Sequence, residues 1–222
     1  MIRVTTCGLL TIEIVEEIIS TDPPRARYAS LTPELLRGRG AVPALMMLKL
    51  LLSRHERFAP RDWLREQYCR DREVFSSVRL DNIAWQLRNL LCPPAYTDLR
   101  KQVVAHVHSS MSSGNGFQLA AFPLIWVDSE ALNWHVEQAA RMERFGDNRL
   151  PFWEAAYTLA KRGEYLPDEI YSPWTSFRRG EVAGMLRQSV QALARLYQAQ
   201  YGAAGEEEAL LLLRRYWQEY RR

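Results

Sequence analysis

The chain of 222 residues is 47% hydrophobic and 25% charged, which is enough for one large core or two smaller ones of about 100 residues each. It has no run of about 18 apolar residues, and acidic residues stand where a secretory signal carries a basic start, so we expect a cytoplasmic protein without a membrane partner. The net charge of +3 is unevenly spread: residues 35–108 hold 13 basic and 7 acidic residues, a net charge of +6 that suits a phosphate-binding surface.

The reactive side chains favour no catalytic or metal chemistry. Cys7, Cys69 and Cys92 are too far apart for a metal knuckle or a disulfide framework. His106 and His108 share one face of an expected strand but lack acidic or sulfur ligands nearby. Phosphate-loop, nucleophile-elbow and zinc-protease motifs are absent, so we predict no enzyme activity, no catalytic residues, no metal and no cofactor.

The first thirty residues favour strands. Ile2–Thr6 and Leu10–Val15 are rich in β-branched residues and are separated by Gly8. The segment Thr21–Arg27, which contains two prolines, predicts a turn, and Tyr28–Leu31 predicts another short strand.

Helical spacing begins at Val42. Leucines recur every three or four residues over Val42–Arg54, which predicts an amphipathic helix. A second helix is expected to start at Pro60, where a missing N–H is tolerated. A third is expected from an N-cap at Ser76-Ser77 to Cys92, with one apolar stripe formed by Leu80, Ile83, Ala84, Leu87 and Leu91.

A β-hairpin is expected after these helices. Gln102–His108 alternates as a strand, Ser109–Asn115 is a small polar loop, and Gly116–Leu119 resumes the extended pattern. Three helices followed by a hairpin is the order of a winged helix-turn-helix domain.

After Pro123 the β-strand signals stop, and four segments predict helices. Glycines separate them, which favours antiparallel helical hairpins. The segments are Ser129–Phe145, Pro151–Arg162, Ser176–Tyr201 and Glu206–Tyr220. Their aromatic residues are expected to form mostly core; they are Trp134, Trp153, Tyr157, Tyr165 and Trp174.

The third predicted helix is the first candidate site. Its residues outside the apolar stripe include Arg, Asn and Gln, which can pair with the edges of guanine or adenine, although any exposed helix carries similar residues. The candidate base-reading residues are Ser77, Arg79, Asn82, Trp85, Gln86 and Asn89.

A second group of candidates would contact the DNA backbone. Arginines cluster on or near the second helix and can neutralise phosphates; they are Arg57, Arg61, Arg65, Arg70 and Arg72. The hairpin loop adds small polar groups suited to phosphate contact, among them Ser112, Ser113 and Asn115.

Two motifs resemble known families. The helix with Leu87-Arg88 and the strand Gly116-Phe117-Gln118-Leu119 resemble the recognition helix and wing of OmpR-type DNA-binding domains. Val127-Asp128 and the run Arg162-Gly163-Glu164-Tyr165-Leu166-Pro167-Asp168 resemble the bacterial transcriptional activator domain. This pairing is similar to regulators of the Streptomyces antibiotic regulatory protein type.

The resemblance implies a mainly α fold with a small β component, in two domains. Residues 1–123 would form the winged helix and residues 124–222 a helical, tetratricopeptide-like activator domain, shorter than in the family. It implies an activator that binds promoter DNA as a homodimer and contacts RNA polymerase. The alternative is a protein-interaction adaptor whose winged helix no longer binds DNA, which Asp81 and the modest basic surplus favour.

Overall fold

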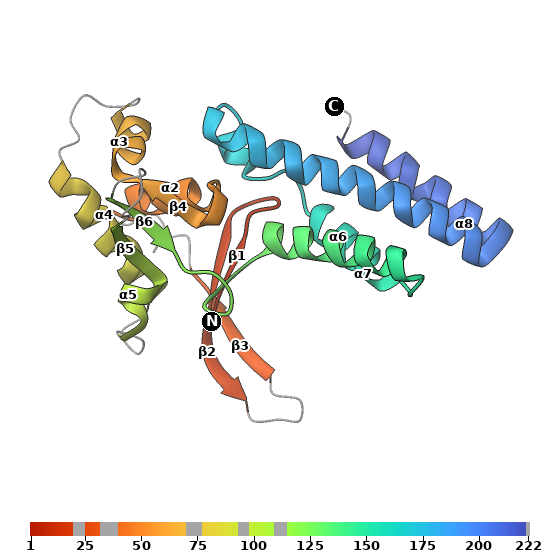
Figure 1. The fold of residues 1–222 in the computed structure, drawn as a ribbon, viewed down its shortest axis with the longest axis horizontal. Coiled ribbons are helices and arrows are strands. Elements are labelled where there is room, and N and C mark those ends of the chain that lie inside the picture. The colour runs from red at the N-terminus through yellow and green to blue at the C-terminus, as the bar shows by residue number, and fades with distance from the viewer. Residues whose placement is uncertain (20–24, 32–39, 70–76, 93–97, 109–114, 221–222) are drawn as a thin grey trace. The chain divides into compact units, whose positions relative to one another are not determined.

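The computed structural model describes residues 1–19, 25–31, 40–69, 77–92, 98–108 and 115–220, and Figure 1 shows their fold. This part of the chain is mainly helical with small sheets, which confirms the predicted class at that level. The chain divides into two compact units. The first unit comprises Met1–Arg3 and Thr11–Trp126, and the second comprises Val4–Leu10 and Val127–Arg222.

A four-stranded sheet has the order β3-β2-β1-β7. Its strands are β1 (Ile2–Thr5), β2 (Thr11–Ile19), β3 (Arg25–Ser30) and β7 (Ile125–Val127). In β1, Ile2 and Val4 are buried and Arg3 between them is exposed, as the alternation of a strand requires.

The β2–β3 hairpin is longer than the sequence predicted. Residues 25–27 were expected in a turn, yet they belong to β3, because β2 continues to Ile19 and its last three residues pair with them. The prolines of the expected turn lie outside the described residues.

Three helices of the first unit follow the predicted spacing. They are α2 (Ala41–Leu52), α3 (Arg61–Cys69) and α4 (Ser77–Leu91). Leu48 and Leu51 of α2 are fully buried, and α2 packs against α4. Pro60 does not start α3, because it is the last residue of strand β4 (Phe58–Pro60).

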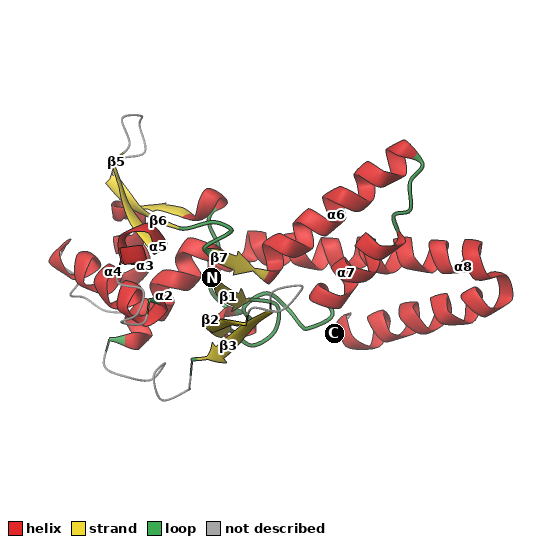
Figure 2. Ribbon diagram, turned by 90° about the horizontal axis from the view of Figure 1, so that it is seen from below, coloured by secondary structure: helices red, strands yellow, loops and turns green. Residues whose placement is uncertain are grey.

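A second sheet has the order β4-β6-β5. Helix α5 (Arg100–Val103) leads into β5 (Val104–His108), so Gln102 and Val103 are helical rather than part of the predicted strand. β5 pairs antiparallel with β6 (Asn115–Leu119), with His106 opposite Phe117, which confirms the predicted hairpin. Figure 2 shows the two strands side by side, and β5 contacts α4.

The second unit is built from α6 (Asp128–Phe145), α7 (Leu150–Ala160) and α8 (Ser176–Tyr220), with short turns η3 (Pro167–Glu169) and η4 (Pro173–Thr175). α6 packs on α7, and α7 packs on α8. α8 contains a non-helical residue, Gly202, at which it folds back on itself (Figures 1 and 2). It therefore consists of two antiparallel helices, close to the predicted pair.

The turn in α8 depends on a close backbone approach. A Cβ at Gly205 would lie 1.8 Å from the Tyr197 carbonyl oxygen. Farther from the turn, Arg187 Nε donates to Tyr216 Oη at 3.3 Å, as expected for two antiparallel arms. Only glycine allows the arms to approach this closely at the turn.

A buried carboxylate explains why Val4–Leu10 belongs to the second unit. Asp128 Oδ1 accepts from the Thr6 N–H and the Thr6 hydroxyl, each at 2.7 Å, and Oδ2 accepts from the Cys7 N–H at 3.0 Å. The Gly8 N–H donates to the Glu164 carbonyl at 2.8 Å, and the Leu166 N–H donates to the Thr6 carbonyl at 2.8 Å. The segment thus satisfies its polar groups on the second unit.

Aromatic residues of the second unit do not all form core. Trp153 and Tyr165 are buried, and Tyr157 and Trp174 are half-buried. Trp134 is 51% exposed, which corrects the expectation that it serves as core. It lies edge-on to His135 and Phe152 at the surface of α6 and α7.

None of the helices in the described part of the chain is long and apolar enough to cross a membrane.

Candidate functional site

Helix α4 has a clear inward face. Its five apolar stripe residues are all buried, and they are the predicted Leu80, Ile83, Ala84, Leu87 and Leu91. The helix packs on α2 and also contacts α3, α5 and β5. This packing fixes which residues of α4 face outward.

The outward face of α4 carries Arg79, Asn82 and Trp85, all exposed. Trp85 is 57% exposed, which is unusual for the largest apolar side chain on a packed helix. Asn82 and Trp85 make no hydrogen bond, ion pair or ring contact with the described residues. Asn89, one turn after Trp85, is half-buried on the same side.

Gln86 lies at the edge of this face rather than at its centre. It is half-buried, and its amide occupies the space beside Gly40, the residue that precedes α2. Gly40 has φ +89°, and any side chain there would collide with the Gln86 amide. Gln86 therefore packs against the start of α2, and only part of it remains available to a partner.

Arg88 ties α4 to the hairpin. Its Nε donates to the Val104 carbonyl at 2.8 Å. Burial lowers the pKa of the Arg88 guanidinium, and the nearby Asp81 carboxylate opposes this shift. Arg88 holds β5 beside α4 and is directed away from the outward face.

Asp81 is neutralised inside the first unit. The Arg61 guanidinium pairs with the Asp81 carboxylate and stands 5.0 Å over the Phe117 ring centroid. His106 Nε2 lies 3.6 Å from Asp81 Oδ1, and the His106 ring meets Phe117 edge-on at 4.9 Å. This cluster joins α3, α4, β5 and β6. Arg61, expected on phosphate, is directed to Asp81 instead.

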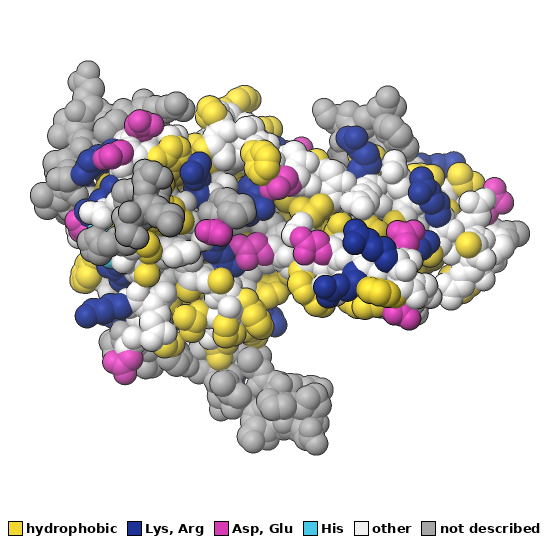
Figure 3. Space-filling model, in the orientation of Figure 1, with side chains coloured by type: hydrophobic (Ala, Val, Ile, Leu, Met, Phe, Trp, Pro, Cys, Tyr) yellow, Lys and Arg dark blue, Asp and Glu magenta, His cyan; other side chains and the backbone are white. Residues whose placement is uncertain are grey.

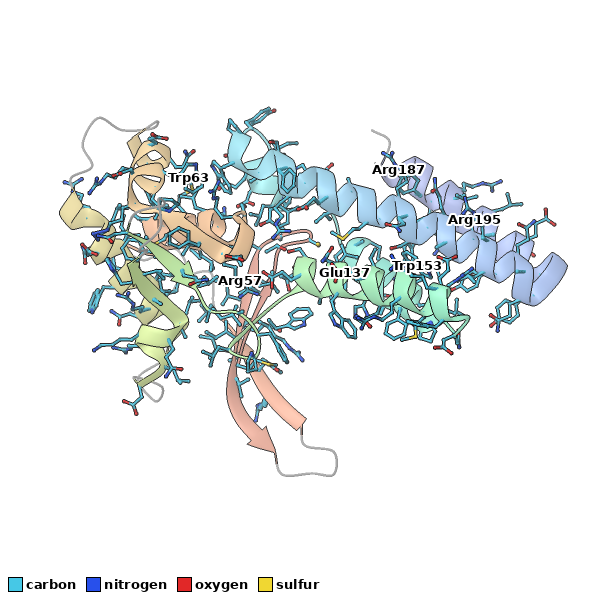
Figure 4. The ribbon with its side chains drawn as sticks, in the orientation of Figure 1. Arg57, Trp63, Glu137, Trp153, Arg187 and Arg195 are labelled. Atoms are coloured by element: carbon cyan, nitrogen blue, oxygen red, sulfur yellow. The ribbon has the colours of Figure 1, made fainter. Side chains whose placement is uncertain are left out.

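Arg57 is buried and stabilises the fold of the first unit. It ends the short turn η1 (His55–Arg57) and is labelled in Figure 4. Only 4% of the residue is exposed. Its guanidinium donates to the Ala120 carbonyl and, from both terminal nitrogens, to the Ile125 carbonyl at 3.2 and 3.3 Å. The expectation that Arg57 neutralises phosphate is therefore wrong, because the side chain is buried and three hydrogen bonds, two of them buried, hold its guanidinium inside.

The remaining backbone candidates are placed in part. Arg65 is part-exposed and pairs with Asp62 at 2.6 Å. Asn115 is exposed at the start of β6, beside the loop of the hairpin. Ser77 begins α4, but its side chain is outside the described residues. Four other candidates, Arg70, Arg72, Ser112 and Ser113, also lie outside them.

The second unit offers a different surface. Figure 3 shows basic and acidic side chains interspersed over its visible face. A cavity of about 410 Å³ opens between the end of α7 and α8, with Arg179 and Arg187 among its lining residues. Arg179 is engaged by the carbonyls of Tyr165, Leu166 and Ile170. Arg187 lies on α8 (Figure 4).

Among the described residues, no group of three or more His, Cys, Asp or Glu side chains is placed to hold a metal ion. The Cys7 thiol is buried, and burial, followed by the Asp128 charge, raises its pKa. Cys7 is therefore a weak nucleophile.

The site contains one arrangement that the sequence did not reveal. The sequence showed Asp81 as a charge opposed to DNA and His106 as half of a histidine pair. The structure brings Arg61 and His106 to Asp81, and both also lie against the Phe117 ring. Residues 61, 81 and 106 are far apart in sequence. His106 lies two positions after buried Val104, so the two side chains share one face of β5, and on that face His106 reaches Asp81 of α4.

Comparison with protein-family models, with curated proteins and with solved structures finds no match to this chain.

Proposed function

We propose that this chain is a DNA-binding transcription regulator whose first unit is a winged helix-turn-helix. In this proposal α4 is the recognition helix in the major groove, and the β5–β6 hairpin is the wing on the DNA backbone. The second unit is a helical-hairpin activator module, in line with the resemblance to OmpR-type and bacterial transcriptional activator domains. That resemblance also supports homodimers on promoter DNA, contact with RNA polymerase and action in the cytoplasm.

The observation that carries the proposal is the two-sided character of α4. On one side Leu80 and Leu87 are almost completely buried. On the other side Asn82 and Trp85 are exposed and have no partners among the described residues. A helix held rigidly from behind, with hydrogen-bonding groups free in front, can read base edges without first reorganising.

The ion pair between Asp81 and Arg61 reduces the repulsion that Asp81 would exert on DNA phosphates. A lone carboxylate on a recognition helix would repel phosphates, but Arg61 and Asp81 form a pair with no net charge. The same pairing, together with the burial of Arg57, lowers the number of cations available for backbone contact. The proposal therefore predicts moderate rather than strong non-specific binding.

Titration of binding against salt concentration tests the proposal. Binding of the full chain to a mixed-sequence duplex, measured by fluorescence anisotropy, should weaken steeply as salt rises, because phosphate contacts release counterions. Binding that stays undetectable at low salt would contradict DNA binding.

Asn82→Ala tests the role of α4. On a duplex selected from a random library, this variant should lose about 1–3 kcal/mol of binding free energy and keep its non-specific affinity. The control is Asn133→Ala, which makes the same change on α6 and should bind like the unaltered chain.

The protein-interaction adaptor remains the second candidate, and Trp85 favours it. An exposed indole at the centre of a helix face is also typical of the anchor residue of a protein interface. The salt titration separates the two candidates, since an adaptor would show no DNA binding at low salt.

A further inference from the structure

The outward face of α4 has an unusual composition for a surface that reads DNA. Its central positions are Asn82, Trp85 and Asn89, which lie at i, i+3 and i+7 and therefore share one side of the helix. Arginine, the residue that most often reads guanine, does not occupy this centre: Arg88 is turned to Val104, and Arg79 lies one turn earlier.

We infer that this face recognises A·T base pairs, with the Trp85 indole against the 5-methyl group of thymine and the Asn82 and Asn89 amides on adenine. This inference rests on the proposed function, because it names the DNA sequence class that α4 would read. The net charge of the first unit does not determine this preference for A·T pairs.

The chemistry of the three side chains matches A·T pairs. In the major groove adenine presents the N7 acceptor beside the N6 amino donor, which an asparagine amide pairs in a bidentate way. Thymine presents a methyl group, the one apolar feature of the groove, which favours contact with an apolar side chain. Trp85 is 57% exposed, so contact with that methyl group would bury apolar surface of both groups, whereas a G·C pair offers Trp85 no methyl group.

The spacing along the helix fits adjacent base pairs. Asn82 and Asn89 are separated by two helical turns, or roughly 10 Å. Base pairs stack at about 3.4 Å, so the three side chains cover about three steps of the groove. Trp85 stands between the two amides, which predicts a thymine flanked by positions where adenine is preferred.

Asn89 is poised for a new hydrogen bond. Its side-chain oxygen is buried and accepts no hydrogen bond from the described part of the chain. A buried amide oxygen without a donor is unfavourable. Rotating the Asn89 amide outward would therefore relieve this cost, and it would break no hydrogen bond of that oxygen. The adenine N6 amino group would supply the missing donor.

Uracil substitution tests the inference with the full chain. A duplex selected from a random library should contain a block of A·T pairs at the positions that α4 covers. Replacing its thymines one at a time by uracil removes only the methyl group. At one position the affinity should fall about fourfold, the effect expected from the burial of one methyl.

Trp85→Ala provides the matched variant. Because Trp85 is exposed, this variant should fold normally, which a thermal melt checks. It should bind the thymine and uracil duplexes equally. Tyr171→Ala, which removes an exposed aromatic ring from the second unit, should retain the fourfold difference.

The possible failures are distinct. If the full chain selects no sequence and does not bind DNA at low salt, the proposed function fails. If it selects a sequence rich in G·C pairs at the α4 positions, or if uracil has no effect at any thymine, DNA binding stands and A·T reading by Trp85 is overturned. A uracil effect that persists in Trp85→Ala also overturns the role of Trp85.

Discussion

Single residues decide how much of the basic segment can reach a partner. Arg57 and Arg61 appear in sequence as two of a cluster of surface arginines, yet one is buried under three hydrogen bonds and the other is paired with Asp81. The sequence could not predict this, because the carbonyls that Arg57 contacts belong to Ala120 and Ile125, more than sixty positions later.

The first prediction concerns Asp81. Asp81→Asn should free Arg61 for phosphate contact, raise the affinity for mixed-sequence DNA and make the slope of log affinity against log salt more negative by about 1. Anisotropy titrations at several salt concentrations measure both. Asp98→Asn is the control, since it changes the net charge equally at an exposed carboxylate elsewhere in the first unit. Equal effects of the two variants would mean that only net charge matters.

The second prediction concerns Arg57. Arg57→Ala should lower the free energy of unfolding by about 3 kcal/mol, because it leaves buried carbonyls without donors. Urea unfolding followed by circular dichroism measures this. Lys101→Ala, which removes an exposed cation from α5, should change stability by less than about 0.5 kcal/mol. A similar small effect of Arg57→Ala would show that its guanidinium is hydrated rather than buried.

At the scale of elements, regular helices were predictable and short elements were not. Leucines spaced by three and four residues placed α2 within two residues at each end. Pro60 was assigned to a helix because proline suits a helix start, but it also suits an edge strand, and β4 is an edge of its sheet. Strands of three residues carry too little periodicity to be recognised from sequence, because tertiary packing determines whether such a segment forms a strand.

The outward face of α4 illustrates the same limit for the candidate site. The buried stripe of α4 was predicted residue by residue, so Asn82 and Trp85 follow as exposed. Gln86 was expected to face outward as well, but it packs at Gly40, a contact between segments 46 residues apart. Helical periodicity identifies the centre of a face, while neighbouring elements determine its edges.

The third prediction compares two glycines of α8. Gly184→Ala should raise the free energy of unfolding by up to about 1 kcal/mol, because a Cβ there meets open space and alanine favours a helix. Gly205→Ala should lower it, because the new Cβ would strike the Tyr197 backbone, which cannot move aside as a side chain can. Thermal melts of the two variants should therefore shift in opposite directions. A rise for both would mean that the arms of α8 separate at the turn without penalty.

At the scale of the whole molecule, the sequence predicted a division after Pro123, and the structure adds two details. The first unit continues to Trp126, because the Leu124 carbonyl accepts from the Ile2 N–H at 2.8 Å and Ile125 accepts from Arg57. The second unit takes Val4–Leu10 as well as Val127 onward. The chain therefore contributes to both units before residue 15, which hydrophobic patterning alone does not reveal.

The last prediction concerns where the first unit can be cut. A fragment of residues 1–123 should be less stable than one of residues 1–127, because it lacks β7 and the Ile125 carbonyl that Arg57 contacts. We expect a lower melting temperature by circular dichroism and a weaker affinity for a selected single-site duplex. Arg57→Ala should destabilise the 1–127 fragment more than the 1–123 fragment, since both contain the Ala120 carbonyl but only the longer one contains the Ile125 carbonyl that accepts two of the Arg57 hydrogen bonds. If the two fragments melt together and respond equally to Arg57→Ala, β7 does not belong to the first unit, and the division lies after Pro123 as the sequence predicts.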